Sequence, residues 1–86
     1  MDKILKELGI NAEGKWRGDI YTVPIETYDE FSILYNKLEQ SDLLQKDSES
    51  KFNIDTAWVN YTYDDYKVTL NGDLNADVYE LSIKEI

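Results

Sequence analysis

Hydrophobic and polar residues alternate towards the C-terminus, and the alternation predicts a β-hairpin centred on Asp64-Asp65. One register places apolar residues opposite one another on a single face: Tyr63 and Tyr66, Tyr61 and Val68, and Val59 and Leu70. The other face would then carry Trp58, Asn60, Thr62, Lys67, Thr69 and Asn71. A slip of one residue would turn every side chain to the wrong face, so the pattern favours this register.

A third strand is predicted over VYELSIKEI, residues 78–86, where apolar and more polar positions alternate again. The buried faces agree if the residues pair as Leu70 with Tyr79, Val68 with Leu81, and Tyr66 with Ile83. The three strands would form a C-terminal meander.

One more strand is predicted nearer the N-terminus, over IYTVPI at residues 20–25. Pro24 has no amide hydrogen to donate to a ladder, so this is expected to be an edge strand or the end of a strand. Two polar stretches are expected to be loops: NAEGKWRGD before this strand, and QKDSESKFN, Gln45 to Asn53.

Two helices are predicted from apolar residues spaced three and four apart. The first covers residues 2–8, with Gly9 and Ile10 suited to a Schellman ending. The second, main helix runs from about residue 28 to 40 behind a capping box formed by Thr27 and Glu30. Its apolar stripe consists of Tyr28, Phe31, Leu34, Tyr35 and Leu38.

The order of elements is therefore α-β-α-β-β-β, which predicts a small α+β fold. We expect a single domain over residues 1–86, with an antiparallel sheet of one N-terminal strand and the meander packed on the main helix.

Charge narrows the range of functions. The chain has 18 Asp and Glu against 9 Lys and Arg, a net charge of −9. Such a protein is repelled by DNA, RNA and anionic lipid, whereas a basic protein surface would attract it. We therefore expect a protein partner, with no direct binding to nucleic acid or membrane. The isolated basic stretch KWRG, residues 15–18, does not change this expectation.

The chain contains no His and no Cys, which removes the commonest general base and the thiol nucleophile. Its four glycines form no phosphate-binding loop. We expect no catalytic activity, no cofactor and no metal centre. Without a long apolar run, the chain is expected to be a cytoplasmic protein. Abundant Ile, Lys, Asn and Tyr are typical of AT-rich coding sequences, such as those of low-GC bacteria and their phages.

The stretch NGDLNAD, residues 71–77, allows two interpretations. Asn and Asp side chains bond readily to local backbone and Asn71-Gly72 tolerates positive φ, so a turn is the main one. Asp73, Asn75 and Asp77 also have the spacing of the first calcium ligands of an EF-hand. The positions for its glycine and its bidentate glutamate are Val78 and Lys84, so weak calcium binding at 73–77 is a minor alternative.

The candidate partner-binding residues are acids in the meander and one tryptophan. They are Asp64, Asp65, Asp73, Asp77, Glu80 and Trp58. The two turns of a three-strand meander lie at opposite ends, so the acids would be spread along the sheet. Trp58 would either be covered by another segment, such as the first helix, or be exposed on the outer face as an anchor for a partner.

Two functional hypotheses follow. The first is a non-catalytic binding protein whose carboxylates replace the phosphates of DNA on a basic partner. In size, acidity and α+β make-up, the chain resembles the small DNA-mimic inhibitors of phages and mobile elements, such as anti-CRISPR and anti-restriction proteins. That resemblance implies inhibition of a basic nucleic-acid-handling protein. The second is a structural or regulatory interaction module, homodimeric through the outer sheet face, whose acidity serves solubility.

Overall fold

A computed structural model of the chain describes residues 1–50 and 56–86. Its helices and strands, in order along the described chain, are α1 (Asp2–Glu7), β1 (Lys15–Arg17), β2 (Ile20–Ile25), α2 (Tyr28–Glu39), β3 (Gln45–Glu49), β4 (Thr56–Tyr63), β5 (Tyr66–Asp73) and β6 (Val78–Glu85). The predicted α+β class is confirmed. The sheet has six strands rather than four, because both β1 and β3 lie in segments expected to be loops.

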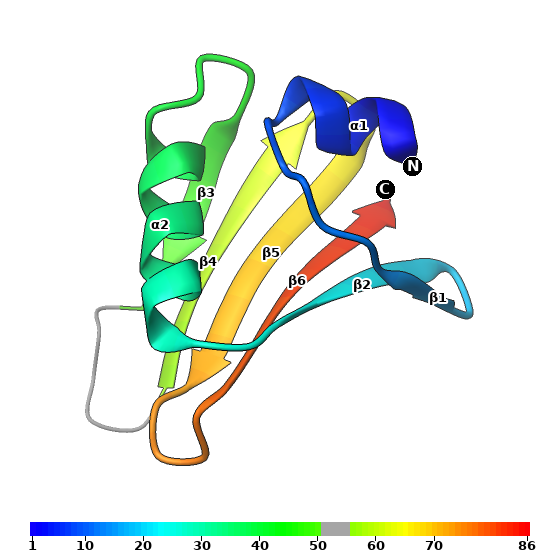
Figure 1. Cartoon of the computed structure of the whole chain (residues 1–86). Coiled ribbons are helices and arrows are strands. Elements are labelled where there is room, and N and C mark those ends of the chain that lie inside the picture. Colours follow the sequence, from blue (N-terminus) through cyan, green and yellow to red (C-terminus); the bar gives the residue numbers. More distant parts are fainter. Residues whose placement is uncertain (51–55) are drawn as a thin grey trace.

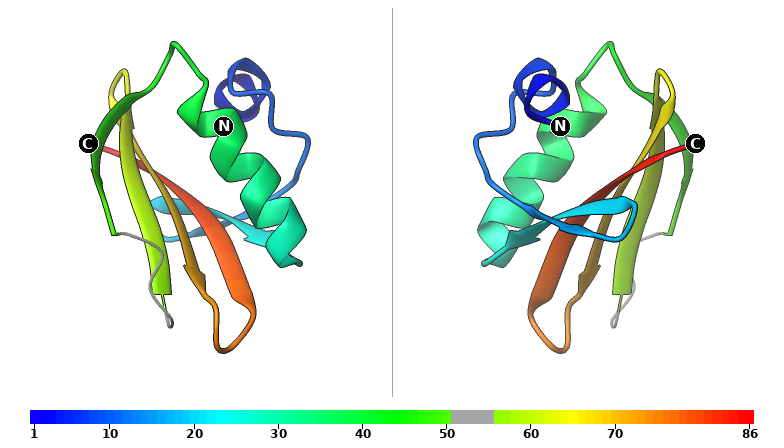
Figure 2. Two further views of the ribbon diagram at one scale, coloured as in Figure 1. Left: turned by 90° about the vertical axis from the view of Figure 1, so that its left-hand side faces the viewer. Right: turned by 90° about the vertical axis from the view of Figure 1, so that its right-hand side faces the viewer.

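All six strands belong to one antiparallel sheet in the order β1-β2-β6-β5-β4-β3 (Figure 1). Neighbouring strands follow one another along the chain except where β2 pairs with β6. Both helices lie over the same face, which we call the inner face (Figure 2). No described helix covers the opposite face, which we call the outer face.

The hairpin register predicted around Asp64-Asp65 is confirmed: Tyr63 pairs with Tyr66 and Val59 with Leu70. Asp64 adopts a positive φ of 54°, which an aspartate tolerates in a tight turn. The other hairpin was predicted two residues out of register, because Leu70 pairs with Leu81 rather than with Tyr79. A shift of two residues keeps every side chain on its predicted face, so the alternation alone could not detect the error.

Gly72 accounts for the shifted register. It was expected in a turn with positive φ, yet it continues β5 opposite Tyr79. A Cβ on Gly72 would lie 2.5 Å from Cδ1 of Tyr79 and 3.4 Å from Cε2 of Phe31. The glycine is therefore needed for close approach of two aromatic rings rather than for a turn. The turn itself falls later, and Asp77 supplies its positive φ of 55°.

The predicted ends of both helices are confirmed. Gly9 has a φ of 73°, and the amide of Ile10 donates to the Leu5 carbonyl at 2.8 Å, as a Schellman ending requires. Thr27 caps α2 by accepting the amide of Glu30 at 3.1 Å.

Pro24 was expected on an edge strand or at the end of a strand. β2 is an interior strand, and Pro24 lies near its end, beyond the residues of β2 that pair with β1.

The core lies between the inner face and the helices. Its most deeply buried side chains are Tyr61, Phe31, Leu38, Leu70, Leu81, Ile83, Val23 and Val68. Ile4 and Leu5 of α1 join the same cluster, so α1 packs on the inner face. It does not cover Trp58, which lies on the outer face and is 39 % exposed.

Candidate functional site

The first turn of α2 and the residues before it carry three exposed carboxylates, from Glu26, Asp29 and Glu30. The Glu30 carboxylate also accepts the backbone amide of Glu26 at 3.3 Å, one residue before the N-cap amide that a capping box would use. Acids are stabilised here because the amide groups at a helix N-terminus carry partial positive charge. The sequence has no Lys or Arg between residues 24 and 36.

The turn between β5 and β6 carries two more exposed carboxylates, from Asp73 and Asp77. Asp73 Oδ1 accepts the amides of Asn75 at 3.0 Å and Ala76 at 3.1 Å. The Asp73 side chain therefore stabilises its own turn, as the main interpretation of NGDLNAD predicts. In residues 1–50 and 56–86, no group of three or more acidic side chains is placed to hold a metal ion.

Tertiary contacts bring these two acidic segments together. Ile25 pairs with Tyr79, so the chain leaves β2 beside the start of β6 and enters α2 directly. The Tyr79 ring centroid lies 5.0 Å from that of Phe31 and 6.1 Å from that of Tyr28. The five carboxylates of Glu26, Asp29, Glu30, Asp73 and Asp77 thus share one end of the molecule, which we call the acidic end.

The Tyr79 ring lies beneath the acidic end, where it packs against Tyr28 and Phe31. Burial and a hydrogen bond with the Asp77 carboxylate raise the pKa of Tyr79 to about 12, so its hydroxyl stays protonated at neutral pH. The Asp77 carboxylate therefore lies close to the Tyr79 hydroxyl. Two apolar side chains are exposed here, Tyr28 at 46 % and Val78 at 59 %. Carboxylates around an exposed aromatic ring are suited to a partner that is both basic and partly apolar.

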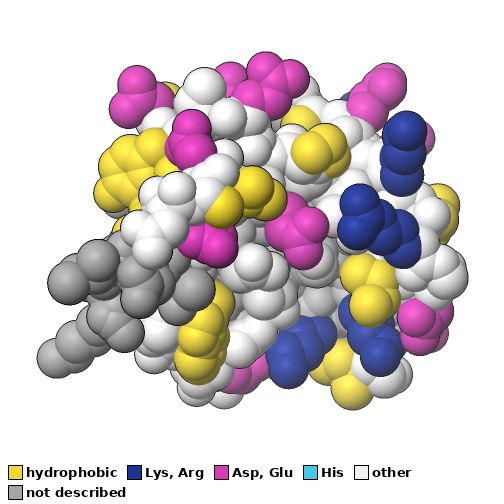
Figure 3. All heavy atoms as spheres, turned by 90° about the horizontal axis from the view of Figure 1, so that it is seen from below, with side chains coloured by type: hydrophobic (Ala, Val, Ile, Leu, Met, Phe, Trp, Pro, Cys, Tyr) yellow, Lys and Arg dark blue, Asp and Glu magenta, His cyan; other side chains and the backbone are white. Residues whose placement is uncertain are grey.

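Charges of opposite sign are unevenly distributed when the molecule is viewed from below (Figure 3). The basic side chains gather in the right-hand half of this view, on the side where Figure 1 shows β1 and β2. Acidic side chains are spread over the whole visible surface, including the right-hand half, whereas the left-hand half shows no basic side chain. The excess of negative charge is therefore concentrated away from the β1–β2 hairpin on this face.

The structure separates the six residues predicted to bind a partner. Asp73 and Asp77 lie at the acidic end, whereas Asp64 and Asp65 form the β4–β5 turn at the other end of β5. As the meander requires, these two acidic turns do not converge. Glu80 lies on the outer face, between Asn71 and Pro24 of the neighbouring strands.

Trp58 also lies on the outer face, where it borders a shallow depression of about 370 Å³ together with Asn60, Thr69, Asn71 and Asp73. Its backbone amide donates to Ser50 Oγ at 3.0 Å. Trp58 is thus fixed in the sheet, and its indole is available to a partner on a face that no described helix covers.

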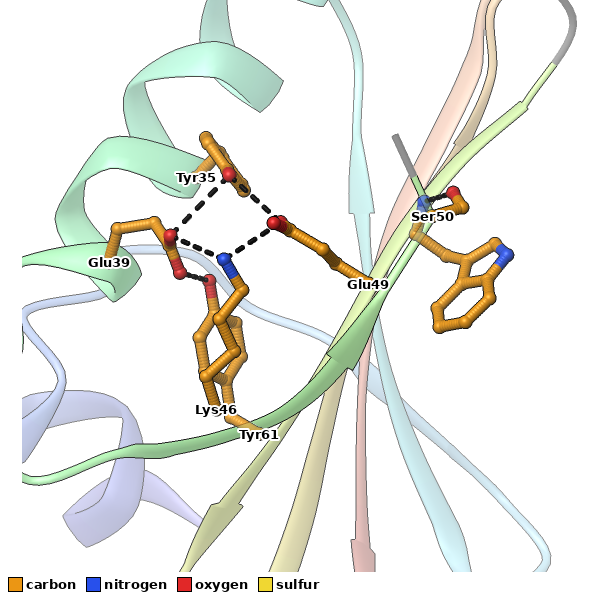
Figure 4. Close-up of polar contacts among 7 residues, drawn as sticks. Tyr35, Glu39, Lys46, Glu49, Ser50 and Tyr61 are labelled. Carbon is orange, nitrogen blue, oxygen red and sulfur yellow. Dashed lines mark hydrogen bonds and ion pairs between the residues drawn. The ribbon is translucent and has the colours of Figure 1, made fainter. Parts of the chain in front are cut away.

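A different arrangement of charges joins β3 to α2 (Figure 4). Lys46 Nζ donates to Glu39 Oε1 at 2.7 Å and to Glu49 Oε2 at 2.8 Å. The Tyr61 hydroxyl donates to Glu39 Oε2 at 2.6 Å, and the Tyr35 hydroxyl donates to Glu49 Oε2 at 3.1 Å. We call these five residues the β3–α2 network. Every residue of β3 is exposed, so this network and the ladder to β4 hold the strand in place.

Titration behaviour in the network follows from these contacts. Burial would raise the pKa of Glu39, but hydrogen bonds from Lys46 and Tyr61 outweigh it and lower the pKa. The bond from Lys46 likewise lowers the pKa of Glu49, and the two carboxylates raise the pKa of Lys46. Burial, followed by the bond to Glu39, raises the pKa of Tyr61. The charged forms of the acids and of the lysine are therefore both stabilised.

Four residues of this site were not among the predicted binding residues: Glu26, Tyr28, Asp29 and Glu30. Their pattern was explained by helix capping and by an apolar stripe, and both explanations are correct. The further signal was that only one residue separates Ile25, at the end of β2, from the capping residue Thr27. Once β2 pairs with β6, this short connection places the helix N-terminus beside the β5–β6 turn.

Comparison of the chain with protein-family models, curated proteins and solved structures finds no match. Within the described residues, no helix has the length and apolar character needed to cross a membrane.

Proposed function

We propose that this protein is a non-catalytic binding protein whose acidic end occupies a basic, nucleic-acid-binding surface of another protein. The observation that supports the proposal is that the N-terminus of α2 and the β5–β6 turn, two separate segments carrying five carboxylates, lie at the same end of the molecule and are joined by the contact of Tyr28 with Tyr79. Residues 24–36 and 68–83, which surround them in the sequence, contain no Lys or Arg. The negative charge of this end is therefore not neutralised from within those segments.

Rigid support makes such a surface a good substitute for DNA. Asp73 is held by two backbone amides, so its side chain loses little conformational freedom on binding. A basic partner that binds these carboxylates releases the counterions it would also release on binding phosphates. Exposed Tyr28 adds an aromatic contact of the kind enriched at interface hot spots. The biological role that fits this chemistry is inhibition of a nucleic-acid-handling protein, as in phages and mobile elements.

The test compares three immobilised baits in a nuclease-treated bacterial lysate. They are the wild type, an acidic-end variant (D29K/D77K), and a control with the same change in charge at the opposite end (D64K/D65K). We expect a basic, DNA-binding protein to be retained by the wild type and the control and lost from the acidic-end variant. The retained protein should be released by rising salt and displaced by added duplex DNA.

Each comparison can overturn the proposal. Equal retention by the acidic-end variant would show that these carboxylates are not the binding surface. Loss from the D64K/D65K bait alone would move the site to the β4–β5 turn, as the sequence-based candidates Asp64 and Asp65 allow. A retained partner that duplex DNA does not displace would contradict the mimicry of DNA. Circular dichroism of each bait excludes unfolding as the cause.

A further inference from the structure

The outer face carries positive and negative charge at opposite ends of its strands. Strand pairing arranges its side chains in rows that run across the sheet, and three of these rows contain Glu80, Ser82 and Lys84. The Glu80 row consists of Trp58, Asn71, Glu80 and Pro24; the Ser82 row of Ser48, Asn60, Thr69, Ser82, Thr22 and Lys15; and the Lys84 row of Gln45, Thr62, Lys67, Lys84, Ile20 and Arg17.

The charges of the outer rows are poorly compensated within the chain. Lys67 lies directly opposite Lys84, a like-charge pair that is unfavourable between neighbouring strands. Lys84 reaches Asp19 only at 3.9 Å, and within the described residues no ion pair involves Lys67. Glu80 lies between Asn71 and Pro24, and it too has no ion pair within this part of the chain. Lys15 and Arg17 line a depression together with Glu80, but within the described residues neither forms an ion pair with it. Glu80 and Lys67 therefore remain available to opposite charges from a partner.

The spacing of these rows makes the face complementary to itself. Glu80 and Lys84 are each two residues from Ser82 on the same strand, so a half-turn about an axis through the Ser82 row exchanges their positions. With this axis in the plane between two faces and perpendicular to the strands, the partner's Glu80 would face Lys84. By symmetry, Lys84 of the partner subunit would face Glu80.

The middle row allows the two faces to approach. On β4, β5, β6 and β2 its side chains are small or of medium size, and Thr22 is already 7 % exposed in the single chain. Asn60, Thr69, Ser82 and Thr22 would each meet their own copy across the axis, and Ser, Thr and Asn side chains can all donate and accept hydrogen bonds. Lys15 lies on β1 at the edge of the sheet, where its long side chain can turn to solvent. The rotation leaves strand directions nearly aligned, which is the common arrangement of two packed sheets about 10 Å apart.

We infer that the outer face is a self-association surface, on which a second copy of this chain docks through reciprocal Glu80–Lys84 pairs. The partner's Glu80 would also lie beside Lys67 and so relieve the repulsion between the two lysines. The acidic end is not needed for this contact, so the inference is independent of the proposed function. Asp73 of the acidic end borders the outer face beside Trp58, so the two surfaces are adjacent.

The test measures the dimer dissociation constant by sedimentation equilibrium of the wild type and of E80K and K84E, each alone and as an equimolar mixture. Each reversal changes two symmetry-related pairs, so each variant alone should dimerise at least about tenfold more weakly. In the mixture, the two substituted side chains would face each other with opposite charges, and the two unchanged ones, Glu80 and Lys84, would do the same. The mixture should therefore regain the affinity of the wild type as a heterodimer.

Two control variants change the same charges elsewhere. D64K lies in the β4–β5 turn and K3E in α1 on the inner face, and both should dimerise as the wild type does. A wild type that stays monomeric up to millimolar concentration would overturn the inference. So would a dimer that neither E80K nor K84E weakens, or a mixture that fails to recover, because each outcome excludes the reciprocal pairing.

Discussion

The acidic end and the β3–α2 network both concentrate carboxylates, yet they differ in what lies opposite each one. In the network, Glu39 and Glu49 share Lys46 and accept tyrosine hydroxyls. At the acidic end, the carboxylates of Asp73 and Asp77 bond to backbone amides and one hydroxyl, with no cation from the surrounding segments. Carboxylates that pair with a cation therefore stabilise this fold, whereas carboxylates without a cation remain available to bind a partner.

The largest effect is expected from removing the support of the acidic end. In Gly72→Ala, the new Cβ would lie 2.5 Å from the Tyr79 ring, so the ring or the strand must shift. We expect the free energy of unfolding to fall by about 2 kcal/mol, as overpacking of a core usually costs. Urea unfolding measures it, with Asn71→Ala as the control on the outer face. A loss below that of the control would contradict the role given to Gly72.

Removal of the network cation should have the next largest effect. Lys46→Met leaves Glu39 and Glu49 without their shared ammonium group, and we expect a loss of about 1 kcal/mol for this partly exposed network. Lys67→Met is the matched control, because that lysine faces Lys84 instead of a carboxylate. It should be neutral or slightly stabilising in urea unfolding. Equal losses for both variants would remove the distinction between partnered and unpartnered charge.

The stability that the β3–α2 network contributes should depend on pH. The pKa values of Glu39 and Glu49 are lowered in the folded protein, so their contribution to stability is complete above the unfolded values of about 4.3. It is lost as the pH falls through the lower folded values. The difference in stability between the wild type and Lys46→Met should therefore be full at pH 7 and shrink below about pH 4. A difference that stays constant between pH 7 and pH 3 would contradict this.

Much of the fold is encoded by local patterns, but some elements are not. The register of β4 with β5 could be predicted because Val59, Tyr61 and Val68 must share one buried face. β3 was not predicted because Gln45–Glu49 contains no apolar residue, and its strand conformation depends on pairing with β4. β1 has three residues, too few to show an alternation.

The site was harder to predict than the fold, because it depends on which strands become neighbours. Asp73 and Asp77 could be predicted as acids of one turn. Their proximity to Glu26 and Asp29 could not be predicted, since it follows from the pairing of β2 with β6. No local pattern in either segment specifies that pairing.

The smallest effect is expected from neutralising one carboxylate of the acidic end. Glu26→Gln should change the free energy of unfolding by less than about 0.5 kcal/mol, as is usual for an exposed surface residue. A slight gain at low salt is expected, because the change relieves repulsion among neighbouring acids. Unfolding at low and high salt measures this, with Glu49→Gln as the destabilising counterpart. If Glu26→Gln cost more than Glu49→Gln, the two regions would have been assigned the wrong roles.

The pairing of β2 with β6 also has a consequence for how the chain reaches its native state. The contacts of β4, β5 and β6 are local hairpins, whereas Val23 of β2 must find Leu81 near the far end of the chain. Closing so long a loop is entropically costly and is slow compared with hairpin formation. We expect the meander to assemble in the transition state and the β1–β2 hairpin to join afterwards. Substitutions in the meander should then slow folding, and those in β1 and β2 should mainly hasten unfolding.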